Sequence, residues 1–88
     1  MLCAIYKSKK KAGAYLYVPQ RDNFEEVPES LMQAFGRPYF VMLFNLAGHK
    51  QLIRISNREV MERLREQGFY LQLPQQEDGL FNSLTAIR

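Results

Sequence analysis

The sequence is poor in the residues that build metal and redox sites. Its 88 residues include one cysteine, one histidine and no tryptophan. Cys3 cannot form an internal disulfide, and it stands in an apolar run where a buried small side chain is the usual outcome. His49 follows a glycine in a predicted loop, where we expect it to be solvated. Because no CxxC or HExxH spacing occurs, we expect no transition-metal site.

Motifs for nucleotide binding and for catalysis are missing as well. Neither GxGxxG nor GxxxxGKS/T occurs, so the usual phosphate-binding loops are excluded. Cys3 and His49 could form a nucleophile–base pair only if the fold happened to bring them together. The acid pairs Glu25-Glu26 and Glu77-Asp78 lie in polar segments, whereas a general acid needs a desolvated carboxylate. We therefore expect a protein that is not an enzyme, with no catalytic residue and no cofactor.

Long hydrophobic runs are also absent. No stretch reaches the ~18 apolar residues of a membrane span. The N-terminal MLCAIYK lacks the basic start and the long apolar run of a signal peptide. We therefore expect a cytoplasmic protein with no membrane contact. Apolar residues make up 47% of the chain, which is enough for one core and indicates a single small domain.

The first half of the chain predicts a hairpin followed by a helix. Residues 2–7 and 14–18 are apolar runs that flank a polar segment with a glycine, which is typical of a β-hairpin. A helix is predicted over residues 28–35, because Pro28 suits a first helical turn and Gly36 is a stop signal.

The second half predicts a strand, a helix and a last strand. Residues 39–46 are almost continuously apolar, which favours a central buried strand. Ser56 and Glu59 have the spacing of a capping box, so a helix is predicted over residues 57–67. Residues 69–73 alternate as a strand. The order β-β-α-β-α-β predicts an α+β fold, a small α/β sandwich whose mainly antiparallel sheet has both helices on one face.

Strand alternation suggests a binding surface. Leu16 and Val18 should lie beneath the helices, so the opposite face should be open. That face would carry Tyr6, Tyr15, Tyr17, Tyr70 and Gln72, fringed by the dense basic cluster Lys7, Lys9, Lys10 and Lys11. Such rings could stack nucleic-acid bases while the lysines hold phosphates. The alternative is that tyrosines simply suit a half-exposed strand and that lysines keep the turn soluble. The C-terminal tail could also cover the tyrosines.

Three stretches carry a family resemblance. CAIYKSKKKAGAYLYV, VPESLMQAFGRP and EQGFYLQLP resemble the YcgL domain of small bacterial proteins, and Gly68 to Pro74 is the most specific part. The resemblance implies a domain over residues 1–74 with a bent antiparallel sheet, a variable tail over 75–88, and no catalytic residues to carry over. Some relatives have a proline run where this chain has Pro74-Gln75-Gln76, so we expect no proline-dependent recognition there. Family genes in some bacteria lie near a ribonuclease D gene, which implies a link to RNA metabolism.

Two functions remain in competition at this point. The first is a non-enzymatic adaptor of bacterial RNA metabolism that binds RNA or a ribonuclease. Its candidate surface is Tyr6, Lys7, Lys9, Lys10, Lys11, Tyr15, Tyr17 and Tyr70. The second is a protein-interaction domain without nucleic-acid affinity, which would use an exposed strand edge or the apolar tail residues Leu80, Phe81 and Leu84. No RNP-type pattern occurs, so the chain is not an RNA-recognition motif.

Overall fold

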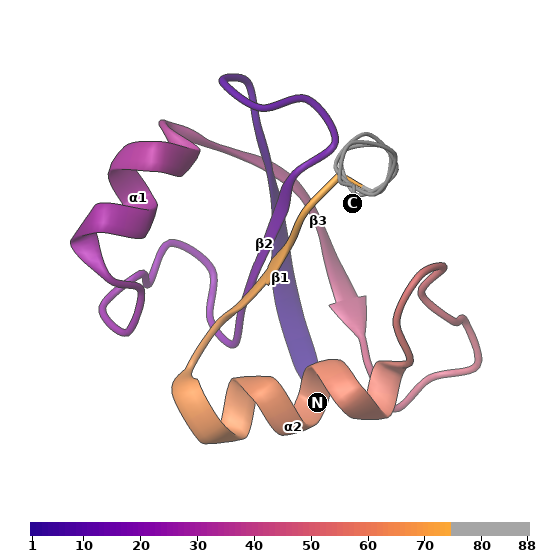
Figure 1. Ribbon diagram of the computed structural model, residues 1–88. Coiled ribbons are helices and arrows are strands. Elements are labelled where there is room, and N and C mark those ends of the chain that lie inside the picture. The colour runs from indigo at the N-terminus through magenta and orange to yellow at the C-terminus, as the bar shows by residue number, and fades with distance from the viewer. Residues whose placement is uncertain (75–88) are drawn as a thin grey trace, which may run out of the picture.

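A computed structural model describes residues 1–74 of the chain (Figure 1). The elements are β1 (Leu2–Ser8), β2 (Tyr15–Val18), α1 (Glu29–Phe35), β3 (Pro38–Asn45), α2 (Asn57–Gln67) and β4 (Tyr70–Gln72). The α+β class and the order β-β-α-β-α-β are therefore confirmed. Within this part of the chain, neither helix is long and apolar enough to cross a membrane. The predicted tail and its apolar residues lie outside the described residues.

All neighbouring strands of the sheet are antiparallel, and their order is β3-β1-β2-β4. The strand predicted to be central, β3, therefore lies at an edge. The β1–β2 hairpin has β4 on its β2 side, so β3 pairs only with β1. Four consecutive β3 residues, Phe40 to Leu43, are 38–49% exposed. The apolar run indicated a strand correctly but did not indicate how deeply it is buried.

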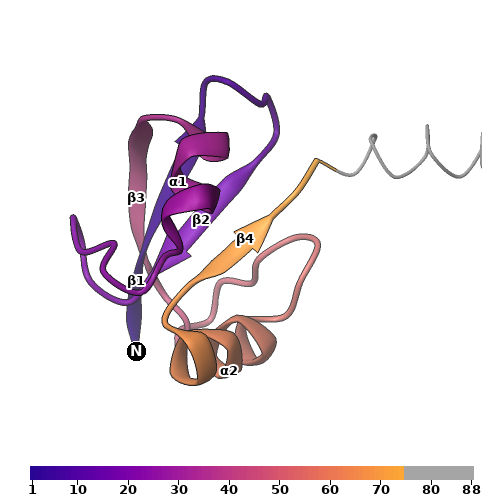
Figure 2. The same cartoon turned by 60° about the vertical axis from the view of Figure 1, so that its left-hand side comes forward.

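One face of the sheet packs against α1. Leu16 and Val18 on β2 are fully buried there with Tyr6 of β1, and they contact Phe35 of α1 and Val27 of the preceding loop. Strand pairing explains the grouping, because Leu16 lies opposite Tyr6 and paired residues share a face. Figure 2 shows α1 in front of β1 and β2 on this side.

The other face packs against α2. Cys3 and Ile5 of β1 lie there with Tyr17 of β2, beneath Val60 and Leu64 of α2. The two helices therefore cover opposite faces, and the prediction of one shared face is wrong. The reason is that β1 is apolar on both faces, so each face needs its own cover. In Figure 1, α1 lies to the left of the strands, while α2 crosses below them.

The ends of α2 follow its sequence signals. The Glu59 backbone N–H donates to Ser56 Oγ at 3.0 Å, which confirms the predicted N-cap. Gly68 ends the helix in the left-handed conformation, and its N–H donates to the Leu64 carbonyl at 3.0 Å. These two ends fix where β4 begins, beside β2.

Candidate functional site

Tyr6 does not belong to the predicted binding surface. It lies on the α1 face and is only 2% exposed, and its ring makes edge-to-face contacts with Phe24 and Phe40. Its hydroxyl accepts a hydrogen bond from the Asp22 backbone N–H at 2.7 Å and donates to Asp22 Oδ1 at 3.2 Å. Burial raises the pKa of Tyr6. This tyrosine therefore anchors the loop before α1 and cannot stack a base.

Tyr17 lies on the α2 face, but it is 4% exposed. Its hydroxyl donates to Gln72 Oε1 at 2.8 Å, and its ring centroid is 5.5 Å from that of Tyr70. Burial raises the pKa of Tyr17 to about 12 and also raises the pKa of Tyr70. Because α2 covers this part of the face, the predicted row of four open tyrosines does not exist.

Two of the four lysines have structural contacts. Lys10 Nζ donates to the Gln33 carbonyl at 3.1 Å, and the stem of Lys10 fills the space where a side chain at Gly36 would lie. The Lys11 backbone N–H donates to Ser8 Oγ at 3.0 Å. The Ser8 hydroxyl in turn donates to the Phe35 carbonyl at 2.6 Å. This half of the turn therefore ties the hairpin to α1.

The other two lysines gather around half-buried tyrosines on the α2 side of the sheet. Lys7 lies opposite Tyr15 on β2 and opposite Tyr39 on β3, so the three side chains share a face. Lys9 Nζ lies 4.4 Å from the ring centroid of Tyr39, and Arg37 Cζ lies 6.0 Å from it. These five residues, Lys7, Lys9, Tyr15, Arg37 and Tyr39, form what we call the cationic tyrosine surface.

Tyr39 and Arg37 were missed by the sequence reasoning. They follow α1 in the chain, far from the lysine cluster in sequence. Only the antiparallel pairing of β3 with β1 brings Tyr39 beside Lys7. The sequence did offer one sign of this part of the surface, an arginine two residues before a tyrosine at the start of an apolar run. That pattern does not specify which strand lies beside the tyrosine.

A hollow of about 360 Å³ continues from this surface. It is lined by Ile5, Tyr15, Tyr17, Gln51, Leu52, Ile53, Arg54 and Gln72. Tyr15 belongs to both the hollow and the cationic tyrosine surface, and Arg54 is the charged residue among those that line the hollow. A cationic, partly aromatic depression of this kind suits a planar group that carries negative charge nearby.

The loop that forms one wall of the hollow is held by Asn57, which is 5% exposed. Asn57 Nδ2 donates to the Lys50 carbonyl at 2.7 Å, and Asn57 Oδ1 accepts from the Leu52 N–H at 3.0 Å. Since both polar ends of this buried amide are satisfied, the loop has a defined position over the sheet. No sequence motif pointed to Asn57, because its partners are loop backbone groups.

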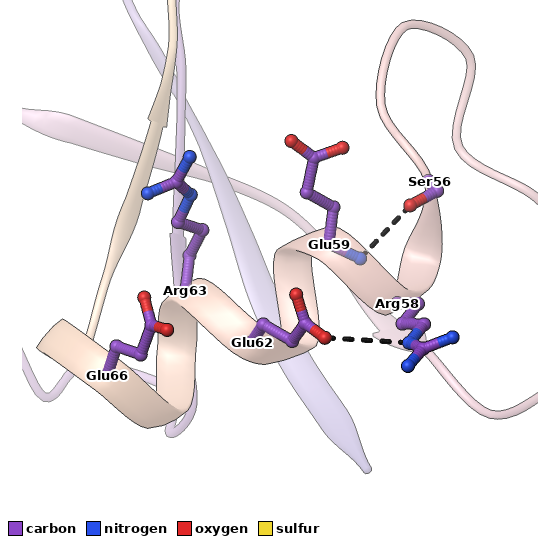
Figure 3. A pocket seen from close by; sticks show the side chains of 6 residues that line it. All are labelled: Ser56, Arg58, Glu59, Glu62, Arg63 and Glu66. Atoms are coloured by element: carbon purple, nitrogen blue, oxygen red, sulfur yellow. Dashed lines mark hydrogen bonds and ion pairs between the residues drawn. The ribbon is translucent and has the colours of Figure 1, made fainter.

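A second depression of about 480 Å³ runs along the outer face of α2 (Figure 3). Its lining is Ser56, Arg58, Glu59, Glu62, Arg63 and Glu66, and all except Ser56 are charged. Arg58 Nε and Glu62 Oε2 are 3.5 Å apart, but both side chains are more than half exposed. Exposed pairs at this spacing contribute about 0.3–0.5 kcal/mol. This depression is therefore a solvated helix face with charges of both signs.

Nothing in the described part of the chain resembles a metal or nucleophile site. Within residues 1–74, no three histidine, cysteine or acidic side chains are placed to hold a metal ion. Cys3 is fully buried, and burial raises the pKa of its thiol to about 11. The thiol is therefore protonated at neutral pH, which makes it a poor nucleophile.

Comparison with known proteins gives one consistent match. The profile described as YcgL domain matches residues 3–75. A YcgL domain-containing protein of Mannheimia succiniciproducens is 62% identical over 86 residues, which are 98% of this chain and 84% of that protein. A relative of the same name in Actinobacillus succinogenes is 63% identical over 81 residues, with 92% and 91% of the two chains covered. One from Haemophilus influenzae is 57% identical over the full 88 residues of both.

Proposed function

Because this chain belongs to the YcgL domain family, whose similar members are named by the domain alone, we propose its function from its surface: it is a non-enzymatic adaptor of RNA metabolism. It binds single-stranded RNA through the cationic tyrosine surface and the adjoining hollow. A cytoplasmic location is part of the proposal, because that is where bacterial RNA is made and degraded.

The observation that carries the proposal is the environment of Tyr39. Lys9 lies 4.4 Å from the centre of its ring, Arg37 lies 6.0 Å from it, and Lys7 is its neighbour across the β1–β3 pair. Proteins that bind single strands combine such cations with aromatic rings, because every base has a face that can stack. Three cations within reach of one strand of RNA give the sequence-independent attraction that such binding requires.

The arrangement suggests a path for the strand. Lys7, Lys9 and Arg37 would contact phosphates, while Tyr15 offers a partly exposed ring at the mouth of the hollow. A base entering the hollow would meet the amide of Gln51 and the guanidinium of Arg54. Each base stacked on an aromatic ring contributes about 1–3 kcal/mol, and the three cations add an attraction to phosphates that weakens as salt rises.

The test is fluorescence anisotropy with a labelled single-stranded RNA at several salt concentrations. We expect the logarithm of affinity to fall linearly with the logarithm of salt concentration. Lys7→Ala combined with Lys9→Ala should reduce the slope by about 0.7 for each phosphate that is no longer neutralised. Tyr39→Ala should weaken binding by roughly 5- to 150-fold at one salt concentration.

The matched control is Arg65→Ala, which removes one positive charge from the exposed side of α2. It should leave the affinity nearly unchanged. Absence of binding at low salt would refute the proposal, and so would an equal loss of affinity in the Arg65→Ala control and in the Lys7 and Lys9 variant. In either case the attraction would not be located at the cationic tyrosine surface.

The second candidate function is binding to a protein partner. The family resemblance implies a ribonuclease, and an acidic patch on it would suit the lysines of this surface. The observation that favours a protein contact is the exposed apolar edge of β3. Capture of partners from a native lysate, with and without ribonuclease treatment, separates the two. A partner that survives the nuclease supports direct protein contact, and one that disappears supports RNA.

A further inference from the structure

Exposed apolar side chains are concentrated at one edge of the sheet. Among residues 1–74, eight large apolar side chains are exposed. Six of them lie on β3 or at the start of β1, and these are Met1, Leu2, Phe40, Val41, Met42 and Leu43. A continuous apolar edge of this kind is unusual on a monomer and marks an interaction site.

The two edges of the sheet differ in their protection. The β4 edge is three residues long, and α2 packs against β4. The β3 edge is eight residues long, and no strand of residues 1–74 pairs with its outer side. Its first residues carry features that hinder pairing with another strand, namely a proline and nearby positive charges. Pro38 begins the strand, Lys9 lies over the Tyr39 ring, and the Arg21 guanidinium lies 3.8 Å from the Phe40 ring centroid. The strand beyond Phe40 carries no such charge.

We propose that β3 pairs antiparallel with β3 of a second copy of this chain, which joins two four-stranded sheets into one. The pairing that fits places Phe40 opposite Leu43 of the second copy and Tyr39 opposite Phe44. This register preserves the faces of both sheets. Phe40 and Leu43 pair with Tyr6 and Ala4, so both lie on the α1 side. Tyr39 and Phe44 pair with Lys7 and Cys3, so both lie on the α2 side.

Charge favours this arrangement. No residue of β3 is charged, so self-pairing brings no like charges into opposition. The cations Lys9 and Arg37 lie at one end of the strand, beside Tyr39. In the proposed register the two Tyr39 residues are five positions apart along the joined strands, about 17 Å, and the two Phe40 residues with their Arg21 guanidinium groups are three positions apart, about 10 Å. Both separations exceed the Debye length of about 8 Å in physiological salt. A parallel pair would place these cations side by side.

The available area sets the expected affinity. The six apolar residues are 38–56% exposed. At roughly 200 Å² for each large side chain, they offer about 500 Å² from each copy and about 1,000 Å² in total. That total is at the lower limit for a specific interface, and the irregular pairing between Ile5 and Tyr6 bends β3 near Val41. We therefore expect a reversible dimer that forms as concentration rises.

Sedimentation velocity of the full chain from micromolar to millimolar concentration tests the proposal. The wild type should shift from monomer to dimer, and Leu43→Lys should remain monomeric with an unchanged circular dichroism spectrum. Leu73→Lys is the matched control, because Leu73 is 50% exposed and follows β4 at the opposite edge of the sheet, so this variant should dimerise like the wild type. A wild type that stays monomeric throughout, or a Leu43→Lys variant that dimerises normally, would overturn the proposal.

A mixing experiment tests the register. Phe40→Lys in one copy and Leu43→Glu in another should each fail to self-associate. Their mixture should form a heterodimer, since the two new charges lie opposite each other in the proposed pairing. If the mixture is also monomeric while the wild type dimerises, this register is wrong. None of these outcomes depends on RNA binding.

Discussion

Tyr6 and Tyr17 show how one residue type serves two faces of the same sheet. Both rings are almost fully buried, and each hydroxyl has a hydrogen-bond partner, Asp22 for the first and Gln72 for the second. An unpaired buried hydroxyl would cost about 1–3 kcal/mol, so the partners are what make burial possible. These tyrosines are therefore parts of the interior that fix the positions of a loop and of β4.

The raised pKa of Tyr17 predicts a loss of stability at alkaline pH. Burial raises it from 10.0 to about 12, so the folded state retains a proton that the unfolded state has lost. Between pH 10 and about 12 the free energy of unfolding should therefore fall as pH rises. The contribution of Tyr17 is roughly 3 kcal/mol, present in full below its ordinary pKa. Urea unfolding at a series of pH values measures it.

Tyr17→Phe is the matched variant. At neutral pH it should cost about 1 kcal/mol, because the hydrogen bond to Gln72 is lost. Above pH 10 its stability should fall less steeply than that of the wild type. Cys3, with a pKa raised to about 11, adds a similar loss that both proteins share. Identical alkaline slopes would show that Tyr17 ionises equally in the folded and unfolded states.

Sequence reasoning located part of the candidate surface. Lys7, Lys9 and Tyr15 were among the residues predicted for a binding surface, and the structure places them on the same side of the sheet. The error on Tyr6 came from assuming a face for β1, since a strand that is apolar on both sides gives no sign of which side meets which helix. Tyr39 requires the β1–β3 pairing, a contact between residues distant in sequence that local pattern does not encode.

At the scale of elements, α2 is the part that the sequence predicted best. Its predicted range and its Ser56 cap both match the structure. These signals depend only on neighbouring residues, so they can be read without knowledge of the fold. The placement of α2 on the sheet depends on packing against Tyr17 and Tyr70, and could not be read in that way.

Gly68→Ala should destabilise the protein. Gly68 has φ of +87°, and an added Cβ would lie 2.5 Å from Glu26 Cβ and 2.6 Å from Glu26 Cγ. The left-handed conformation alone costs an alanine about 1–2 kcal/mol, so thermal unfolding should occur at a clearly lower temperature. Gly48→Ala is the control, since its nearest neighbours would be 3.4 Å away and its φ is not positive. Similar losses of stability from both substitutions would contradict the explanation.

The misplacement of β3 also has a physical cause. An apolar, β-branched and aromatic run indicates a strand that meets apolar surroundings, but those surroundings can be a partner molecule as well as the chain's own core. The exposed residues Val41 to Leu43 therefore carry the same sequence signal as a buried strand would. The proposed dimer accounts for the apolar character that the single chain leaves uncovered.

At the scale of the whole molecule, the sheet separates two apolar clusters. Val18 lies in the cluster beneath α1, and Val60 lies in the cluster beneath α2. Both side chains are 0% exposed. The two clusters share the β1 backbone but none of their buried side chains.

Val18→Ala and Val60→Ala should therefore have additive effects on stability. Each removes the same two methyl groups from a buried site and should cost about 1–3 kcal/mol. The double variant should lose the sum to within about 0.5 kcal/mol, because the two side chains lie in separate clusters. Urea unfolding of the four proteins measures this, and a single transition in each would show that the clusters unfold together. A larger departure from the sum would mean that the two clusters are energetically coupled through the sheet.

The two-sided cover of β1 has a consequence for how its alignment is chosen. Shifting this strand by one position would exchange the apolar side chains of one face for those of the other, so both registers would remove a similar apolar area from water. The hydrophobic effect alone therefore distinguishes poorly between the native register and a shifted one. The register is therefore selected by two hydroxyl groups of β1, those of Tyr6 and Ser8, because their hydrogen bonds to Asp22 and to the Phe35 carbonyl form in only one alignment.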